Sequence, residues 1–171
     1  MRGNSGFSLF ELLTVIGIIA VVSAIAIPNM IAWRNRTKLG DGARDIYSAF
    51  QLAKSMAAKE NNDVTVFFAP SGGLARDYIL FIDDGSGTGD LDSDGIPDGA
   101  NNGVQDGTER ILSSRQLPNG VNIDATTFAG HAVAFGGNGL PDTIGNAQIS
   151  NTAGDIRRIF VSMAGRVRIQ Y

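Results

Sequence analysis

The chain has 171 residues and a formal net charge of −3, from 14 lysines and arginines against 17 acidic residues. That length suits one domain with a single core, and that charge excludes a protein that binds nucleic acid through its overall charge. Cysteine is absent, which excludes disulfide frameworks, cysteine zinc sites and thiol nucleophiles. His131 is the only histidine and is expected in a surface turn, so the usual pairs of nucleophile and base are missing and we expect no enzymatic activity.

The first element is an apolar run from Phe7 to Ile27, 21 residues with a single charged side chain, Glu11. About 20 apolar residues are enough to cross a bilayer as a helix, so this segment is predicted to span a membrane. Arg2 is the only charged side chain before the run. The positive-inside tendency then places residues 1–6 in the cytoplasm and the chain from Pro28 onward on the other side of the membrane.

Glu11 needs a partner, because a carboxylate inside an apolar span costs a few kcal/mol and is rarely kept uncompensated. If a peptidase cut between Gly6 and Phe7, the new amino terminus of Phe7 would lie one helical turn from Glu11. The two opposite charges can then neutralise each other, within one chain or between neighbouring chains of an assembly. Cleavage and packing would be two parts of one mechanism.

The sequence GFSLFE at residues 6–11, followed by a long apolar run, resembles the class III signal of type IV pilins and type II secretion pseudopilins. The resemblance implies that a membrane-embedded aspartyl peptidase cleaves after Gly6 and methylates the amine of Phe7, and that Glu11 guides subunit docking. Pro28 matches a proline of this family that often kinks or locally melts the first helix, since proline lacks one backbone donor.

Two alternatives explain part of the same segment. One is an ordinary secretory signal peptide cut at Ala24-Ile25-Ala26, but its apolar core is usually only about 7 to 15 residues long and would have no use for Glu11. The other is a plain single-span anchor, which accounts for the hydrophobicity and leaves the Gly6-Phe7 junction and Glu11 unexplained.

Residues 29–60 are predicted to extend the helix, with an amphipathic stretch that should pack on a sheet. Its apolar or small residues alternate in steps of four and three: Leu39, Ala43, Ile46, Phe50, Ala53 and Ala57. Gly40 and Gly42 near its start are expected to loosen the helix by up to about 1 kcal/mol each. The run Asn61-Asn62-Asp63 is expected to end it.

The part from about residue 63 to 171 consists of short β-rich runs between clusters of Gly, Pro, Asn and Asp. Strands are predicted at 64–68, 78–82, 110–112, 121–123, 132–135, 158–162 and 167–171. An antiparallel sheet or sandwich is favoured, so the predicted fold is α+β and pilin-like, a long N-terminal helix packed on a C-terminal antiparallel β head. The order of the elements and the final GRVRI strand resemble minor pilins of the pseudopilin H and FimT (GspH/FimT) kind.

Eight acidic residues and no basic one lie between Asp83 and Glu109, which indicates a long exposed loop. Within it, oxygen-bearing residues alternate before a glycine, as in calcium loops. The predicted ligands of a structural calcium ion are Asp90, Asp92, Asp94, the carbonyl of Ile96, and Asp98. Asn101 stands where an EF-hand has its bidentate glutamate, and the flanking elements are strands rather than helices. The alternative is a solvated acidic loop without an ion.

Four of the fourteen basic residues lie within twelve positions near the C-terminus: Arg157, Arg158, Arg166 and Arg168. Strand alternation places Arg166 and Arg168 on one face and Val167, Ile169 and Tyr171 on the core face. Two adjacent guanidiniums can hold phosphate oxygens. In the FimT branch a Gly-Arg-x-Arg motif here is associated with DNA capture, which implies that role for Gly165, Arg166 and Arg168. The alternative is solvated arginines on an edge strand.

These features predict three parts: a leader (1–6), a transmembrane and filament-core helix (7–27) and a periplasmic head (28–171). The function predicted is that of a minor pilin or pseudopilin, cut by prepilin peptidase and taken up from the inner membrane by its assembly platform. It would join other pilins in a type II secretion pseudopilus or type IV pilus and support protein secretion. Two alternatives remain: a minor pilin that binds DNA during transformation, and an anchored, calcium-dependent adhesion module.

Overall fold

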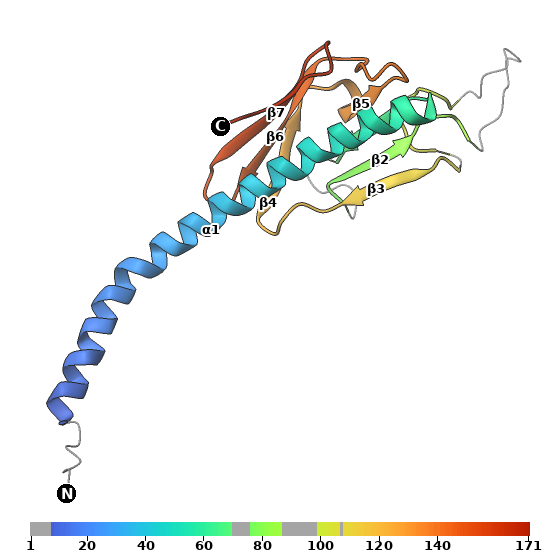
Figure 1. Cartoon of the computed structure of the whole chain (residues 1–171). Helices are drawn as coiled ribbons and strands as arrows, with labels where there is room; N and C mark the ends of the chain where they lie inside the picture. Colours follow the sequence, from blue (N-terminus) through green and yellow to red (C-terminus); the bar gives the residue numbers. More distant parts are fainter. Residues whose placement is uncertain (1–7, 70–75, 87–98, 107) are drawn as a thin grey trace, which may run out of the picture.

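The computed structural model of the chain describes residues 8–69, 76–86, 99–106 and 108–171. The elements in chain order are α1 (Leu9–Glu60), β1 (Val64–Phe68), β2 (Tyr78–Ile82), β3 (Ile111–Arg115), β4 (Val121–Thr126), a 3-10 turn (Ala129–His131), β5 (Ala132–Phe135), β6 (Gly145–Asn151), β7 (Ile156–Val161) and β8 (Val167–Gln170). Figure 1 shows α1 leaving the β head as a long arm, with the N-terminus at its far end. The predicted α+β fold is confirmed.

The helix α1 has 52 residues and a side-chain cap at its start. The hydroxyl of Ser8 accepts a hydrogen bond from the amide of Glu11 at 3.2 Å, as a favoured N-cap residue does. Asn61 follows the last turn in the left-handed conformation (φ 53°), so the helix ends where predicted. The helix is continuous through Pro28, and its first half follows a smooth curve (Figure 1). The helix is therefore not locally melted at Pro28, because the loss of one backbone hydrogen bond is accommodated by bending of the helix.

Two four-stranded antiparallel sheets form the head, in the orders β3-β2-β1-β5 and β4-β6-β7-β8. The predicted stripe of α1 packs on both sheets, and all of its members are buried: Leu39, Ala43, Ile46, Phe50, Ala53 and Ala57. Phe50 is the centre of the aromatic core, with ring centroids 5.8 Å from Phe68 and 6.1 Å from Phe135. Burial of this stripe couples the arm rigidly to the head.

Gly40 and Gly42 bring the helix close to the second sheet. A Cβ on Gly42 would lie 3.2 Å from Cγ1 of Val121, and one on Gly40 would lie 2.9 Å from Nη1 of Arg157. Both glycines are buried. The expectation that they only loosen the helix is therefore incomplete, because the missing side chains make the contact between helix and sheet possible.

Most strands lie where the sequence predicts them, and β1, β2 and β5 match to the residue. No strand was predicted at β6, which pairs with both β4 and β7 inside the second sheet. Its sequence, GNAQISN, contains a single β-branched residue, Ile149, so it has little β-propensity. The alternation of polar Asn146, Gln148 and Ser150 with Ala147 and Ile149 is the signal in the sequence that could have identified it.

Candidate functional site

The first half of α1 is an exposed apolar arm. From Leu9 to Thr37 its side chains are exposed apart from partial burial at Ser23 and Asn35, and the first buried residue is Leu39. The large apolar side chains of this arm are 46% to 80% exposed. An 18-residue window reaches a mean hydropathy of 2.5 with no residue buried, so the helix is long and apolar enough to cross a membrane. Water is an unfavourable surrounding for such a surface, at about 1.5–3 kcal/mol for each large apolar side chain.

Glu11 lies in the first turn of the arm. A negative charge there is favoured by the helix dipole. Within the described residues no basic side chain forms an ion pair with Glu11. Gly6 and Phe7 lie outside the described residues, so the predicted cleavage junction and the pairing of Glu11 with a new amino terminus stay predictions.

The predicted calcium ligands Asp90, Asp92, Asp94, Ile96 and Asp98 also lie outside the described residues. Across the parts of the chain that the structure describes, no three His, Cys, Asp or Glu side chains gather in a way that could hold a metal ion.

Two buried carboxylates, Asp83 and Glu109, lie at the two ends of the acidic segment, residues 83–109. Asp83 is 1% exposed and accepts hydrogen bonds from the hydroxyl of Thr65 at 3.1 Å and the amide of Gly103 at 2.8 Å. Glu109 is 4% exposed and accepts from the amides of Gly85 at 2.9 Å and Asp106 at 3.0 Å. Burial raises the pKa of Glu109, although these two amide bonds oppose the shift.

A third carboxyl lies beside this pair. Burial, then the charges of Asp83 and Asp142, raise the pKa of Asp63. Backbone amides thus donate hydrogen bonds to the carboxylates in the described part of the acidic segment. The carboxyls of Asp63 and Asp83 lie close enough for their charges to interact.

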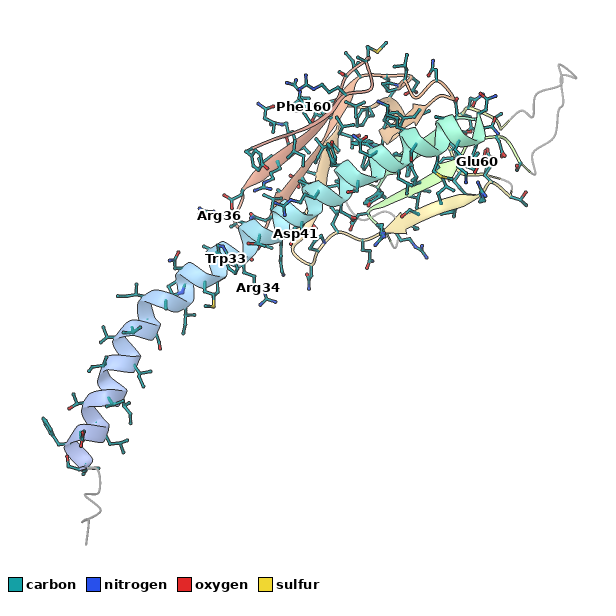
Figure 2. All side chains as sticks on the ribbon, in the orientation of Figure 1. Trp33, Arg34, Arg36, Asp41, Glu60 and Phe160 are labelled. Atoms are coloured by element: carbon teal, nitrogen blue, oxygen red, sulfur yellow. The ribbon has the colours of Figure 1, made fainter. Side chains whose placement is uncertain are left out.

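Arg166 and Arg168 face the same open groove on the outer side of the second sheet. Arg168 is directly opposite Phe160 of β7, and both arginines are exposed. The groove has a volume of about 540 Å³ and is also lined by Ile144, Asn146 and Met163. Figure 2 places Phe160 on the side of the sheet that faces away from α1. The predicted alternation holds for Arg166, Arg168 and the buried Val167.

Tyr171 lies on the α1 side of the sheet, as the alternation predicts, but it is not buried in the core. It was expected on the core face, but β8 ends at Gln170 and the Tyr171 side chain is 83% exposed. Its ring lies under the guanidinium of Arg157, 4.4 Å from the ring centroid. The prediction of a core position was wrong because Tyr171 follows the last residue of β8, at the open edge of the space between sheet and helix.

Sequence reasoning also missed the apolar part of the groove. Ile144 precedes β6 and Met163 lies in the turn after β7, and both are exposed. Neither residue belongs to a motif, and only the pairing of β6 with β7 brings them near Arg168. His131 lies in the exposed 3-10 turn, as expected, with Nδ1 at 2.8 Å from the hydroxyl of Thr126.

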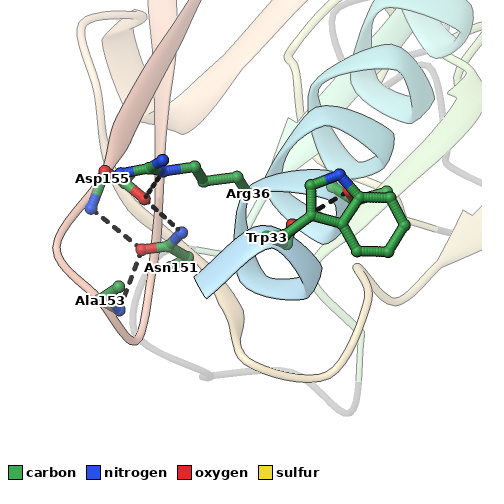
Figure 3. A network of polar contacts seen from close by, with 6 residues as sticks. Trp33, Arg36, Asn151, Ala153 and Asp155 are labelled. Atoms are coloured by element: carbon green, nitrogen blue, oxygen red, sulfur yellow. Dashed lines mark hydrogen bonds and ion pairs between the residues drawn. The ribbon is translucent and has the colours of Figure 1, made fainter. Parts of the chain in front are cut away.

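The arm meets the head at a braced turn (Figure 3). Arg36 reaches from α1 to Asp155, with Nε 3.6 Å from Oδ2. Asn151 donates to Asp155 at 3.0 Å, and its own side-chain oxygen accepts from the amide of Ala153 at 3.0 Å. The turn between β6 and β7 is therefore ordered where it faces the helix.

Comparisons with known proteins cover the same features. The family model described as Type II transport protein GspH matches residues 42–165, and the prokaryotic N-terminal methylation motif matches residues 1–27. The type IV wide pilus major component PilA4 of Thermus thermophilus is 30% identical over 104 residues, which cover 52% of this chain and 79% of that protein. The type IV major pilin protein PilA of Myxococcus xanthus is 33% identical over 79 residues, 44% of this chain and 36% of that protein. The match thus spans only about a third of that pilin.

Two solved structures share the fold. The type IV minor pilin FimU of Pseudomonas aeruginosa superposes with a TM-score of 0.55 and 16% identity, covering 81% of this chain and 92% of that chain. The minor pseudopilin EpsH from the Type 2 Secretion System of Vibrio cholerae gives a TM-score of 0.52 and 14% identity, covering 78% and 96%.

Proposed function

The chain belongs to the Type II transport protein GspH family, and on that premise we propose that it is a minor subunit of a type II secretion pseudopilus or a type IV pilus. Pilins and pseudopilins are structural subunits that assemble with other pilins, not enzymes. In this function prepilin peptidase removes residues 1–6, the head lies in the periplasm, and the subunit supports filament assembly and protein secretion.

The exposed apolar arm carries this proposal. A surface of this kind needs a cover, first lipid and then the arms of neighbouring subunits. The N-terminal methylation motif covers residues 1–27, which include the start of this arm. The burial of α1 from Leu39 onward leaves the arm free to enter a filament while the head stays outside it.

Glu11 is proposed to set the register of that packing. In lipid or in a filament core its charge is costly, and the amine of Phe7 released by cleavage would compensate it. A neighbour shifted along the filament axis would leave Glu11 unpaired, so misaligned subunits would be disfavoured.

The test is the intact mass of the protein from cells with and without prepilin peptidase. With the peptidase, the product should lose residues 1–6 and gain one methyl group at Phe7. The variant Gly6→Leu should stay whole, and the matched control Gly3→Leu, in the same leader, should still be cut. A product that begins at Ile27, or one that is whole in both strains, would contradict the proposal.

The groove beside β8 favours a second candidate function, DNA binding. Arg166 and Arg168 are exposed on one side, and Arg158, whose Nε donates to Oε1 of Gln148 at 2.9 Å, is exposed on the same strand as Phe160. Neighbouring guanidiniums suit phosphate oxygens, and an aromatic ring suits a base.

Arginine variants distinguish this candidate from a solvated edge strand. The double variant Arg166→Gln with Arg168→Gln should weaken DNA retention while assembly is unchanged. The slope of log affinity against log salt concentration should become shallower by about two, one for each lost phosphate contact. The control Arg115→Gln changes an exposed arginine on the other sheet and should leave DNA retention as it is. Equal retention by the wild type, the double variant and the control would refute DNA binding at this groove.

A further inference from the structure

A basic depression lies where α1 enters the head. It has a volume of about 300 Å³, and its lining contains three arginines, two aromatic residues and no acidic side chain. We name it the neck site, formed by Trp33, Arg36, Thr37, Gly40, Arg44, Arg157 and Tyr171. Each of its five α1 members lies three or four residues from another member, so they share one face of the helix.

Arg157 is held in the neck site without a neutralising side chain. Its guanidinium lies 4.4 Å from the centroid of the Tyr171 ring and against Gly40, where a Cβ would approach Nη1 to 2.9 Å. Among the described residues no acidic side chain forms an ion pair with it. Arginine stays charged at any physiological pH, and its planar fork suits a phosphate or carboxylate. The site is therefore prepared for an anion.

The other two arginines are only loosely paired. Arg36 is 3.6 Å from Asp155 with side chains 72% and 41% exposed, and Arg44 is 3.4 Å from Asp41 with side chains 74% and 54% exposed. Exposed ion pairs of this kind contribute little, so both guanidiniums can turn toward a stronger anionic ligand.

The length of the arm places the neck site at the membrane surface. At 1.5 Å per residue, the helix from Leu9 to Trp33 is about 36 Å long, slightly more than the hydrocarbon core of about 30 Å. Trp33 then lies at the membrane–water interface, where tryptophan is enriched. Figure 2 shows Trp33, Arg34 and Arg36 at this junction, outside the buried part of α1.

We propose that the neck site binds the phosphate headgroup of an anionic phospholipid in the leaflet next to the head. Charge complementarity and depth in the membrane together favour a lipid over an acidic protein segment. The bound lipid would set the angle of the head above the membrane and would be released when the subunit enters a filament. The inference rests on membrane anchoring of α1, and it is independent of which filament the subunit joins.

The experiment uses Trp33, the only tryptophan of the chain, as the reporter. The full chain is reconstituted in vesicles in which either phosphatidylglycerol or phosphatidylcholine carries bromine on the part of the acyl chain nearest the headgroup. Quenching of the Trp33 fluorescence then measures the local share of each lipid. We expect severalfold enrichment of phosphatidylglycerol. Arg157→Gln should reduce the enrichment about fivefold. Arg158→Gln should leave the enrichment unchanged, because Arg158 is on the opposite face of β7. Arg36→Gln is a second variant of the neck site, at an exposed position.

Three results would overturn the proposal: equal quenching by both brominated lipids, equal effects of Arg157→Gln and Arg158→Gln, or displacement of the phosphatidylglycerol by millimolar inorganic phosphate, which would indicate a site for free anions. Loss of enrichment in Arg157→Gln, with a circular dichroism spectrum identical to that of the wild type, supports it. If no brominated lipid quenched Trp33 at all, membrane anchoring itself would fail, and that outcome is distinct from failure of the neck site.

Discussion

Replacing Phe50 with alanine tests whether the core that joins arm and head has the structure described. Phe50 is fully buried, and its ring centroid lies 5.8 Å from Phe68, 6.1 Å from Phe128 and 6.1 Å from Phe135. Truncation removes these ring contacts and leaves a cavity between helix and sheets, so the free energy of unfolding should fall by about 3–5 kcal/mol. Because domains of this size have only about 5–15 kcal/mol in total, the variant should be close to unfolding.

The assay is urea denaturation of the full chain in detergent micelles, followed by circular dichroism of the head. Leu52→Ala is the matched control, because Leu52 is on the same helix and 40% exposed, and its midpoint should shift little. A loss below about 1 kcal/mol for Phe50→Ala, or an equal loss in both variants, would refute the packing of α1 on both sheets.

Three further predictions concern the head. Burial raises the pKa of Glu109 and of Asp63, so both carboxyls bind a proton more readily in the folded protein than in the unfolded chain. Their contribution to the free energy of unfolding should therefore grow as the pH falls from 7 toward the usual carboxyl range, and shrink as the pH rises. Glu109→Gln should reduce this pH dependence in urea midpoints measured from pH 7 to 5. A Gly42→Val side chain would press on Val121, whose Cγ1 lies 3.2 Å from the added Cβ, and should lower the unfolding free energy by about 1–3 kcal/mol, whereas Gly17→Val on the open arm should not. If the acidic loop binds calcium, millimolar calcium should raise the melting temperature of the wild type and not of Asp92→Ala, and equal shifts in both would refute that site.

The groove and the neck site lie in different parts of the subunit. Both are basic, but the groove lies on the outer side of the second sheet, whereas the neck site lies where the apolar arm begins. Arg158 and Arg157 are neighbours in the chain and belong to opposite faces of β7. A single pair of glutamine variants therefore separates a ligand of the outer face from a ligand of the membrane surface.

The local order of residues already determined much of this protein. The apolar run with Glu11, the stripe from Leu39 to Ala57 and the stop at Asn61 depend on spacing of three to four residues or on one residue's backbone preference. Strands such as β1 and β2 are rich in β-branched and aromatic residues, so propensity was enough to locate them. The family motif at residues 1–27 is likewise a contiguous pattern.

Only the tertiary structure decided the rest, because it depends on contacts between residues far apart in the chain. β6 has little propensity of its own and is a strand because β4 and β7 supply hydrogen-bond partners on both sides. Tyr171 lies on the α1 side of the sheet but outside the core, because pairing stops at Gln170, and the guanidinium of Arg157 packs on its ring there. Gly40, predicted only to weaken a helix, leaves the space that this guanidinium occupies, and no spacing rule within one element contains that information.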